Sequence, residues 1–486
     1  MQTSQPLSLP IQVATALAAG TALRFVVGLH PVWQLTWLAP AALLWLAYRS
    51  NRRDACWSVA LAALIGVSAN FPYFHLVMPL PAAIGVTLAL AALWTGAVLM
   101  ARRLVLRYQH WWTVLVYPVA WTAFDTLMAA FLPDGNFSSL AYSQCELLPL
   151  MQMASLCGVP GIVFLVSLLP SALAFAASRG LRAALPPLCM SAALLAAALA
   201  FGQARLQQAA PSATLAIGLV AIDDAIGPKA SAPYVSAIWA QYDRHVAALA
   251  AQGARIVLLP EKIAVLTPAQ QQQWQQHLRA LAAAHHIWLV AGVGTDTDGK
   301  RLNLAWMFAP DGTLAANYQK QHVAPPEREF IRGDQFALRE VEGFAAGLAI
   351  CKDMHFASLG RGYALRQARV MLVPAWDFEL DAWYAAHLSA VRGIEGGYAV
   401  VRAARDGLLT VSDAQGRFLA QADSAGMPGA ALLARLPLAP AAPTLYSRIG
   451  DLVGWLCVGA AALMLGMGRG CARARARLPA QPRQAA

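Results

Sequence analysis

Long apolar runs separated by short polar connections fill the first 200 residues of the chain. Seven such runs precede residue 205 and an eighth lies near the C-terminus, at residues 11–29, 33–48, 55–76, 80–101, 111–131, 157–177, 184–203 and 449–468. Most of them approach the ~20 residues that a helix needs to cross a hydrocarbon core of ~30 Å. The pattern predicts a transmembrane domain of about seven helices over residues 1–204 and a further membrane helix over residues 446–470.

Residues 205–445 have a different pattern. Short apolar stretches predict strands at 214–222, 255–259, 287–293, 302–308, 344–350, 370–373, 398–403 and 408–412. Amphipathic stretches between them predict helices at 233–252, 268–285, 355–367 and 381–395. This alternation is typical of an α/β domain, and about 240 residues are enough for one domain with a large core.

The composition supports membrane insertion, since 58% of the residues are hydrophobic and 13% are charged, against roughly 25% charged in soluble domains. Arginines follow the second, fourth and sixth runs: Arg49, Arg52, Arg53, Arg102, Arg103, Arg107, Arg179 and Arg182. The connections after the first, third and fifth runs contain no Lys or Arg. Because basic connections stay in the cytoplasm, we expect residues 205–445 on the opposite side and a basic cytoplasmic tail at 471–486. The net charge of +11 then reflects topology, and no nucleic-acid partner is expected.

Candidate chemistry centres on one cysteine. Residues 205–445 contain a single cysteine, Cys351, directly after the apolar stretch at 344–350. No cysteine spacing in the chain indicates a disulfide framework or a metal site. A lone thiol facing an oxidising compartment is a liability unless it has a function, which favours a nucleophile over a buried filler. We expect Cys351 at a turn from a strand into a helix, whose positive end would stabilise a thiolate.

Two further side chains complete a possible covalent catalyst. A thiol that takes an acyl group needs a base and a positive group for the oxyanion. Glu261, at the end of an apolar strand, fits the base, and Lys320 fits the oxyanion stabiliser. Taken singly, a strand-end Glu is more often a solvated cap and a Lys more often a surface charge. Their occurrence together with Cys351 favours catalysis.

These residues lie in segments that resemble the three catalytic motifs of the nitrilase superfamily. The segments are Leu259-Pro260-Glu261, residues 318–325 around Lys320, and Ile350-Cys351-Lys352-Asp353. Segments at 140–144, 158–161, 392–398 and 401–404, and the order of spans and catalytic domain, resemble the membrane branch of that superfamily, apolipoprotein N-acyltransferase. The resemblance covers essentially the whole chain.

The resemblance implies a multi-pass α-helical membrane domain joined to a nitrilase-type αββα sandwich. It also implies a thioacyl enzyme, in which Cys351 takes an acyl chain from a phospholipid and passes it to the α-amine of a diacylglyceryl-cysteine on an apolipoprotein. Glu261 would be the base and Lys320 the oxyanion stabiliser, without cofactor or metal. The protein would lie in the inner membrane of a Gram-negative bacterium, with residues 205–445 in the periplasm.

The sequence departs from the pattern of this branch in its loops. Arg328 stands where a second, supporting glutamate is expected, so Glu327 or Glu329 must take that role, and we predict Glu327. Lys352 and Asp353 replace a tyrosine and a glutamate. These changes leave a second hypothesis open, a membrane-tethered amidohydrolase with water as acceptor. A third, a non-catalytic lipid-binding protein, is disfavoured because the three catalytic residues are present.

Overall fold

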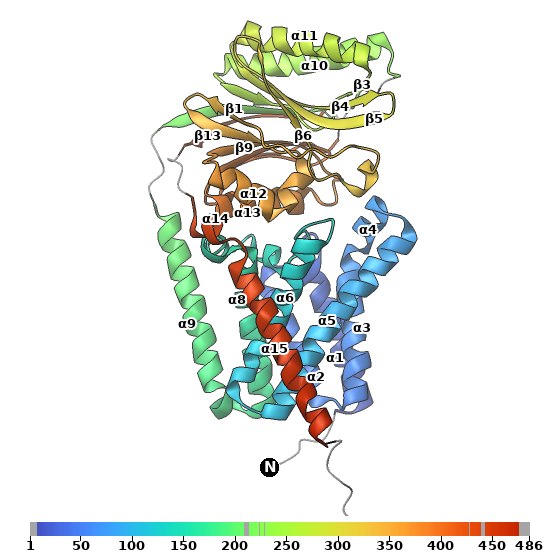
Figure 1. Cartoon of the computed structure of the whole chain (residues 1–486), viewed down its shortest axis with the longest axis vertical. Helices are drawn as coiled ribbons and strands as arrows, with labels where there is room; N and C mark the ends of the chain where they lie inside the picture. The colour runs from blue at the N-terminus through green and yellow to red at the C-terminus, as the bar shows by residue number, and fades with distance from the viewer. Residues whose placement is uncertain are drawn as a thin grey trace, which may run out of the picture.

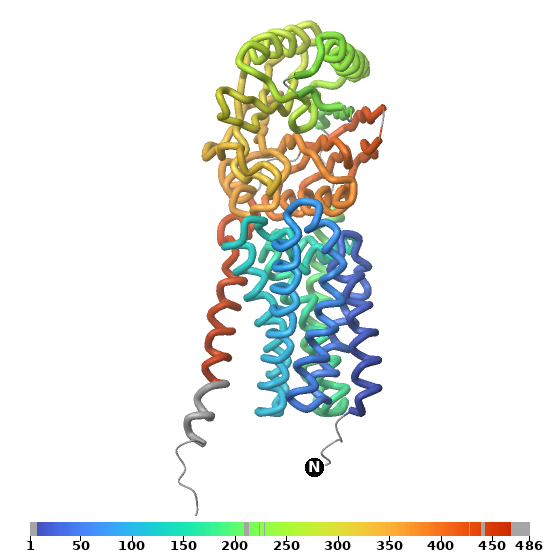
Figure 2. The backbone as a smooth tube through the Cα atoms, turned by 90° about the vertical axis from the view of Figure 1, so that its right-hand side faces the viewer, coloured from blue at the N-terminus to red at the C-terminus, as the bar shows by residue number. Residues whose placement is uncertain are grey.

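The computed structural model describes residues 7–208, 213–222, 224–227, 229–426, 428–438 and 443–475, without the side chains of 468–475. The predicted basic tail beyond residue 475, with Arg477 and Arg483, lies outside the described residues. A bundle of long helices forms one half of the molecule and an α/β region covers one end of it (Figures 1 and 2). The fold class predicted from the sequence is confirmed.

The bundle contains the apolar runs identified in the sequence. Its helices are α1 (Leu9–Val27), α2 (Ala39–Arg49), α3 (Arg52–Val67), α4 (Phe71–Val77), α5 (Leu80–Tyr108), α6 (Val116–Phe131), α7 (Leu148–Met151), α8 (Ala154–Arg179), α9 (Leu181–Leu206) and α15 (Leu452–Arg475). Among the described residues, six stretches are long and apolar enough to cross a membrane, and residues 452–467 of α15 form a shorter apolar helix. The chain is therefore a multi-pass membrane protein.

The predicted run at 33–48 is not one continuous α-helix. It consists of a 3-10 turn, η1 (Trp33–Trp37), followed by α2. The backbone N–H of Val32 donates to the carbonyl of Phe25 at 2.7 Å, and that of Leu7 donates to the carbonyl of Arg49 at 3.3 Å. Residues 32–49 therefore run antiparallel to residues 7–25 and span the same length of the bundle. The helix α2 alone, with 11 residues, is too short to do so.

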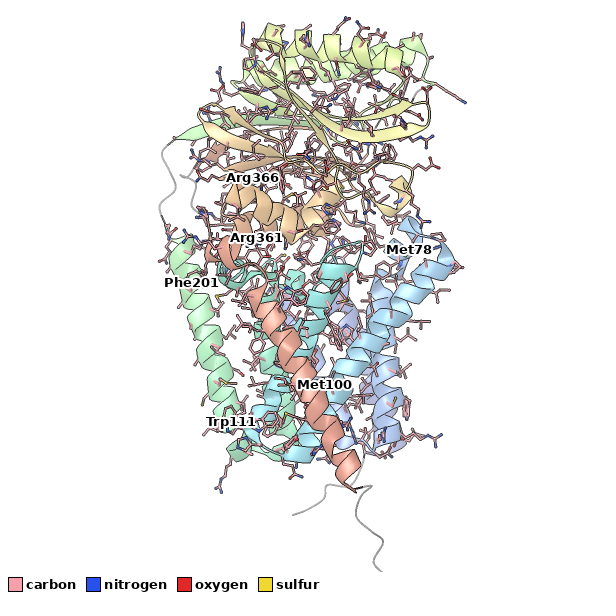
Figure 3. All side chains as sticks on the ribbon, in the orientation of Figure 1. Met78, Met100, Trp111, Phe201, Arg361 and Arg366 are labelled. Carbon is pink, nitrogen blue, oxygen red and sulfur yellow. The ribbon has the colours of Figure 1, made fainter. Side chains whose placement is uncertain are left out.

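The C-terminal end of α5 lies at the end of the bundle opposite the α/β region, where Figure 3 shows Trp111. Arg102 donates to the carbonyl oxygens of Ala47 and Ser50, which lie at the end of α2. Arg179, at the end of α8, donates to the carbonyl of Val105. Helix ends that carry the basic connections therefore share one side of the bundle.

Two β-sheets form the α/β region, with seven and six strands among the described residues. One sheet has the order β13-β1-β2-β4-β5-β6, with β3 paired to β4, and the other has the order β12-β11-β10-β9-β8-β7. The strands are β1 (Thr214–Ala221), β2 (Ile256–Leu258), β3 (Val265–Leu266), β4 (Trp288–Thr297), β5 (Lys300–Phe308), β6 (Leu314–Gln319), β7 (Leu338–Val341), β8 (Phe344–Leu348), β9 (Val370–Trp376), β10 (Ala399–Arg405), β11 (Leu408–Ser412), β12 (Phe418–Asp423) and β13 (Ala430–Pro437). Helices α10 (Ala232–Ala251) and α11 (Pro268–His285) cover the first sheet, and α12 (Ala357–Leu365) and α13 (Ala382–Gly396) cover the second, facing the bundle (Figure 1). The layers are those of an αββα sandwich.

The strand β2 shows how the sequence builds these layers. Side chains alternate between the two faces of a strand. Ile256 and Leu258 lie in the core between the two sheets, whereas Val257 and Leu259 lie in the core under α10 and α11. A strand buried on both faces reads as a continuous apolar run, which is why residues 255–259 were recognisable in the sequence.

The sequence did not reveal β6, β7, β12 and β13, nor the two-residue β3. The strands β6 and β13 are the edges of the first sheet, and β7 and β12 are the edges of the second. In β12, the side chains alternate between half-buried and exposed positions, and the strand ends in Gln421-Ala422-Asp423. An edge strand is covered on fewer sides, so its sequence carries a weaker apolar signal.

A break in α8 joins the bundle to the α/β region. Gly158 has a φ of +66° within this helix, and its Cα lies against the ring of Tyr446. The next residue, Val159, donates its N–H to Glu395 Oε1 at 3.0 Å. Glu395 lies on α13 and forms an ion pair of 2.7 Å with Arg392. A carboxylate of the α/β region thus serves as the acceptor for a backbone group of the membrane region.

We predict that Gly158→Ala destabilises the protein by about 2–4 kcal/mol, because an L side chain is strained at this φ and the new Cβ would lie 2.3 Å from the ring of Tyr446. Thermal unfolding in detergent measures the effect. Gly85→Ala in α5 is the control, since a Cβ there meets no atom within 4 Å, and it should leave the midpoint unchanged or raise it slightly. Equal midpoints for the two variants would contradict the proposed constraint at Gly158.

Candidate active site

A buried cluster of charged side chains lies at one edge of the two sheets. Lys320 Nζ lies 2.8 Å from Glu261 Oε1 and 2.7 Å from Glu327 Oε2. Asn303, on β5, donates its side-chain amide to Glu261 Oε1 at 2.6 Å and to Glu327 Oε1 at 2.8 Å. Lys262 donates to Glu327 Oε1 as well. Two carboxylates are therefore matched by two ammonium groups, and each carboxylate accepts more than one hydrogen bond.

Burial and pairing decide the ionisation of this cluster. Burial alone would lower the pKa of Lys320, but the adjacent carboxylates of Glu261 and Glu327 outweigh it and hold the pKa well above its ordinary value. Burial would raise the pKa of Glu327, but Lys320 and Lys262 outweigh it and lower the pKa. The two carboxylates thus favour the charged form of Lys320.

The structure distinguishes the two glutamates that follow Lys320. Glu327 is 4% exposed and bonds Lys320, whereas Glu329 pairs with Arg301 at the surface. The sequence-based choice of Glu327 is compatible with this arrangement. Asn303 was not recognised, although a polar residue inside the apolar stretch 302–308 was the signal that could have revealed it.

The backbone around Glu261 is packed too tightly for most side chains opposite it. The N–H of Leu259 donates to Val290, and the N–H of Gly292 donates to Pro260. A Cβ on Gly292 would lie 2.5 Å from the carbonyl of Pro260 and 2.6 Å from the Cα of Glu261. The N–H of Glu261 donates across to the carbonyl of Ala375 on β9, so both sheets fix this carboxylate.

Cys351 lies on a strained turn directly after β8. Its φ is +43°, a conformation that few non-glycine residues adopt. The thiol donates to the carbonyl of Trp376 at 3.5 Å. The expected turn from a strand into a helix is present, but the helix that begins at Cys351 is a short 3-10 helix, η6 (Cys351–His355), and the α-helix α12 begins only at Ala357.

The electrostatic surroundings keep the Cys351 thiol protonated at rest. Burial and the negative charge of Glu261 raise its pKa to about 12, against the opposing effect of Lys320 and Arg402. Glu261 Oε2 is buried and has no hydrogen-bond partner among the described side chains. A proton leaving the thiol therefore has a carboxylate oxygen within electrostatic reach to accept it.

Asp353 ties the turn of Cys351 to the segment that carries Lys320. Its Oδ2 accepts from the hydroxyl of Tyr318 at 2.7 Å and from the N–H of Ile350 at 3.0 Å. Its Oδ1 accepts from the backbone N–H groups of Gln321 at 3.1 Å and His322 at 2.8 Å. The sequence showed Asp353 only as a replacement for a glutamate. Its role here is positional, because it links the segment of Cys351 to the segment of Lys320.

Lys352 points away from the charged cluster. Its Nζ lies 2.6 Å from Asp134 Oδ1, in the connection after α6, and its side chain is 5% exposed. Lys352, which follows Cys351 directly in the sequence, thus links the α/β region to the membrane region. It does not share a carboxylate with Lys320.

A second buried ion pair supports the opposite side of the thiol. Arg402 on β10 forms two hydrogen bonds with the carboxylate of Asp377, and both side chains are buried. The neighbouring Trp376, whose carbonyl accepts from Cys351, donates its indole N–H to Asp406 at 2.7 Å. The guanidinium of Arg405 stacks 3.9 Å above the same indole. These contacts fix the carbonyl that accepts from the thiol.

A cavity of about 600 Å³ opens from the thiol toward the membrane helices. Its wall in the α/β region includes Glu261, Lys320, Glu327 and Cys351. Its opposite wall is mainly apolar, with Tyr73, Phe74, Val77, Met78, Val86, Leu90 and Met128 from α4, α5, α6 and the connection between α4 and α5, and it also includes Asp125 of α6. Figure 3 shows Met78 at the end of the bundle nearest the α/β region, and Trp111 at the other end. The cavity can hold a small polar group at one end and an apolar chain at the other.

Among the described residues, no group of three His, Cys, Asp or Glu side chains is placed so that it could hold a metal ion. His322 lies in the loop after Lys320 and contacts Asp353, and His285 and His286 lie at the end of α11.

Two family models match the chain. Residues 220–429 match the carbon-nitrogen hydrolase family, and residues 19–172 match the apolipoprotein N-acyltransferase N-terminal domain. An apolipoprotein N-acyltransferase of Geobacter metallireducens is 24% identical over 394 residues, which cover 72% of this chain and 73% of the relative.

Shorter similarities involve amidases. An omega-amidase of Homo sapiens is 33% identical over 148 residues, which are 26% of this chain and about half, 52%, of that enzyme. Among solved structures, an amidase from Nesterenkonia sp. has 22% sequence identity and a TM-score of 0.40, with 46% of this chain and 90% of that chain covered.

We predict that Lys320→Met nearly eliminates acylation of Cys351, whereas Lys352→Tyr retains most of it. Loss of one good oxyanion donor typically costs about 2.7–4 kcal/mol, or roughly 10²–10³ in rate. Lys352 is paired with Asp134, which is 43% exposed and can be solvated when its partner is lost. Single-turnover acylation rates test the pair of variants.

Thermal unfolding must accompany these rates, because removing Lys320 leaves two buried carboxylates with less compensation. A folded Lys320→Met protein that acylates normally, together with an inactive Lys352→Tyr protein, would reverse our assignment of the oxyanion cation.

Proposed function

The chain belongs to the carbon-nitrogen hydrolase (nitrilase) superfamily as an apolipoprotein N-acyltransferase-like member, and we propose that it transfers an acyl chain from a phospholipid to the N-terminal amine of a diacylated apolipoprotein. It is a membrane-bound acyltransferase. The choice of substrate rests on the cavity, because one wall holds Cys351 and the other is formed mainly by apolar side chains of the membrane helices. A soluble amide would not require such a wall.

In the proposed first half-reaction, Cys351 attacks the carbonyl carbon of an acyl ester while Glu261 takes the thiol proton. The negative charge that develops on the carbonyl oxygen is stabilised by Lys320. The carbon-oxygen bond of the ester then breaks, the lysophospholipid alkoxide recovers the proton from Glu261, and a thioester remains on Cys351. Glu327 and Asn303 keep Lys320 and Glu261 in place.

In the proposed second half-reaction, the acceptor amine attacks the thioester carbonyl. Glu261 takes a proton from the amine as the carbon-nitrogen bond forms, and Lys320 again stabilises the oxyanion. The carbon-sulfur bond breaks, and the proton returns to the sulfur. Because the pKa of the Cys351 thiol is about 12, little thiolate is present at neutral pH, and the first half-reaction therefore needs Glu261 as a base.

The proposed site of action is the inner membrane of a bacterium, with the α/β region in the periplasm. Arg102 and Arg179 bond the ends of α2 and α5, and Figure 3 shows Trp111, just after α5, at the end of the bundle away from the α/β region. Helix ends that carry basic residues tend to remain in the cytoplasm. Residues 205–445 form the proposed periplasmic catalytic domain between the transmembrane domain at 1–204 and the membrane helix at 446–470.

We predict that purified protein, phospholipid and a diacylated lipoprotein yield a lipoprotein heavier by one acyl chain, measured as intact mass. Cys351→Ala should abolish the product, and without acceptor the wild-type protein should accumulate a hydroxylamine-labile acyl group on Cys351. Cys56→Ala, which removes an exposed cysteine of α3, is the matched control and should remain active. Normal turnover by Cys351→Ala would exclude the mechanism.

The same experiment separates the amidohydrolase hypothesis from the acyltransferase. Release of free fatty acid from the thioester, with the mass of the acceptor unchanged, would indicate water as acceptor. Absence of any thioester with every donor would favour the non-catalytic alternative.

We predict that alkaline phosphatase fused at residue 300, at the start of β5 beside the exposed turn at 298–299, is active in cells, because this enzyme folds only outside the cytoplasm. Fusions at residue 51, between α2 and α3, and at residue 110, after α5, should be inactive. The reverse set of activities would contradict the proposed orientation.

A further inference from the structure

We propose that Arg328 and Arg332 bind the phosphate of the donor glycerophospholipid at the rim of the active-site cavity. This inference rests on the proposed function and names the group by which the donor is recognised. It concerns the position at which the sequence departs from the pattern of its family, since Arg328 stands where a glutamate was expected.

The charges lining the cavity leave these two arginines available. Three other cations line it, and each is already paired: Lys320 with Glu261 and Glu327, Lys262 with Glu327, and Lys352 with Asp134. Within the part of the chain that the structure describes, Arg328 and Arg332 line the same cavity, are exposed, and have neither an ion pair nor a side-chain hydrogen bond. They are the positive groups that a new anion could engage.

The backbone that carries the arginines is fixed to the catalytic segments. The N–H of Gly333 donates to the carbonyl of Lys320, and the N–H of Ile331 donates to that of Arg301, both at 2.8 Å. The side-chain amide of Gln319 donates to the carbonyl of Ile331 at 2.8 Å. Phosphate held on this loop would therefore keep a defined position relative to Lys320.

The chemistry of the two walls matches an amphiphile. Guanidinium groups form paired hydrogen bonds with phosphate oxygens, and two arginines can hold one phosphate without reading the rest of the headgroup. The same cavity is lined by Val77, Val86 and Leu90 of the membrane helices. Ile331, between the arginines, is 48% exposed and adds an apolar surface at the rim.

A glycerophospholipid can meet both walls at once. Only the short glycerol backbone separates its phosphate from its acyl ester, so the phosphate can stay at the arginines while the ester reaches Cys351 and the chain lies along the helices. Recognition through phosphate predicts use of both zwitterionic and anionic phospholipids as donors.

The test compares two acyl donors in micelles of a neutral detergent, by single-turnover acylation of Cys351. One donor is a phospholipid and the other is a p-nitrophenyl ester of the same acyl chain, which lacks phosphate. In the double variant Arg328→Gln/Arg332→Gln, the half-saturating concentration of phospholipid should rise roughly tenfold or more, as expected for the loss of charged hydrogen bonds. The preference for phospholipid over the ester should fall by the same factor.

A matched control removes the same charge elsewhere. Arg244 on α10 and Arg435 on β13 are exposed and do not line the cavity. The double variant Arg244→Gln/Arg435→Gln should keep the wild-type preference between the donors. An equal loss in the two double variants would assign the effect to net charge and overturn the proposal.

Inorganic phosphate separates the two sources of the anion. If it fails to inhibit the wild-type protein at millimolar concentration, the phosphate is recognised as part of a lipid, as proposed. If it inhibits while the arginine double variant keeps its affinity for phospholipid, the proposal is wrong. A wild-type protein that forms no thioester with either donor would instead refute the proposed function.

Discussion

The buried ammonium of Lys320, held between the carboxylates of Glu261 and Glu327, is the interaction on which the site depends. Burying any one of these charges alone would be strongly unfavourable, so the three can remain inside only together. They come from three separate segments of the first sheet, after β2, after β6 and in the 3-10 turn at Pro325–Glu327. Their mutual attraction, with Asn303 bridging the carboxylates, fixes the relative positions of these segments.

The second sheet brings the nucleophile to this cluster by a different device. Asp353 accepts backbone hydrogen bonds from both the Cys351 turn and the Lys320 segment, and Arg402 with Asp377 supports the neighbouring strand ends. Cys351 and Lys262 both have positive φ, at +43° and +48°. Strain of this kind persists only where surrounding contacts impose it. The polar network supplies those contacts while the thiol stays exposed to the cavity.

The membrane region completes the cavity and does more than anchor the domain. Polar contacts cross the junction: among them, Glu395 accepts from the backbone of Val159, Arg392 donates to the hydroxyl of Tyr142, and Lys352 pairs with Asp134. Helices α12 and α13 pack in one continuous core with the bundle. A cavity with a reactive wall and a mainly apolar wall results, which suits a reaction on a substrate that stays in the bilayer.

The sequence by itself determined the class of the molecule and the identity of its candidate catalytic groups. Membrane helices and doubly buried strands leave apolar runs whose lengths differ, and Glu261, Lys320, Glu327 and Cys351 stand at the ends of such runs or in the loops after them. The sequence could not reveal the edge strands β6, β7, β12 and β13, because their pairing depends on neighbours and not on their own hydrophobicity. The tertiary structure alone decided the partners of Asn303, Asp353 and Lys352, and it showed that the helix that begins at Cys351 is a short 3-10 helix. Hydrogen bonds and ion pairs between residues far apart in the chain depend on distances in space, and no local pattern of residues records them.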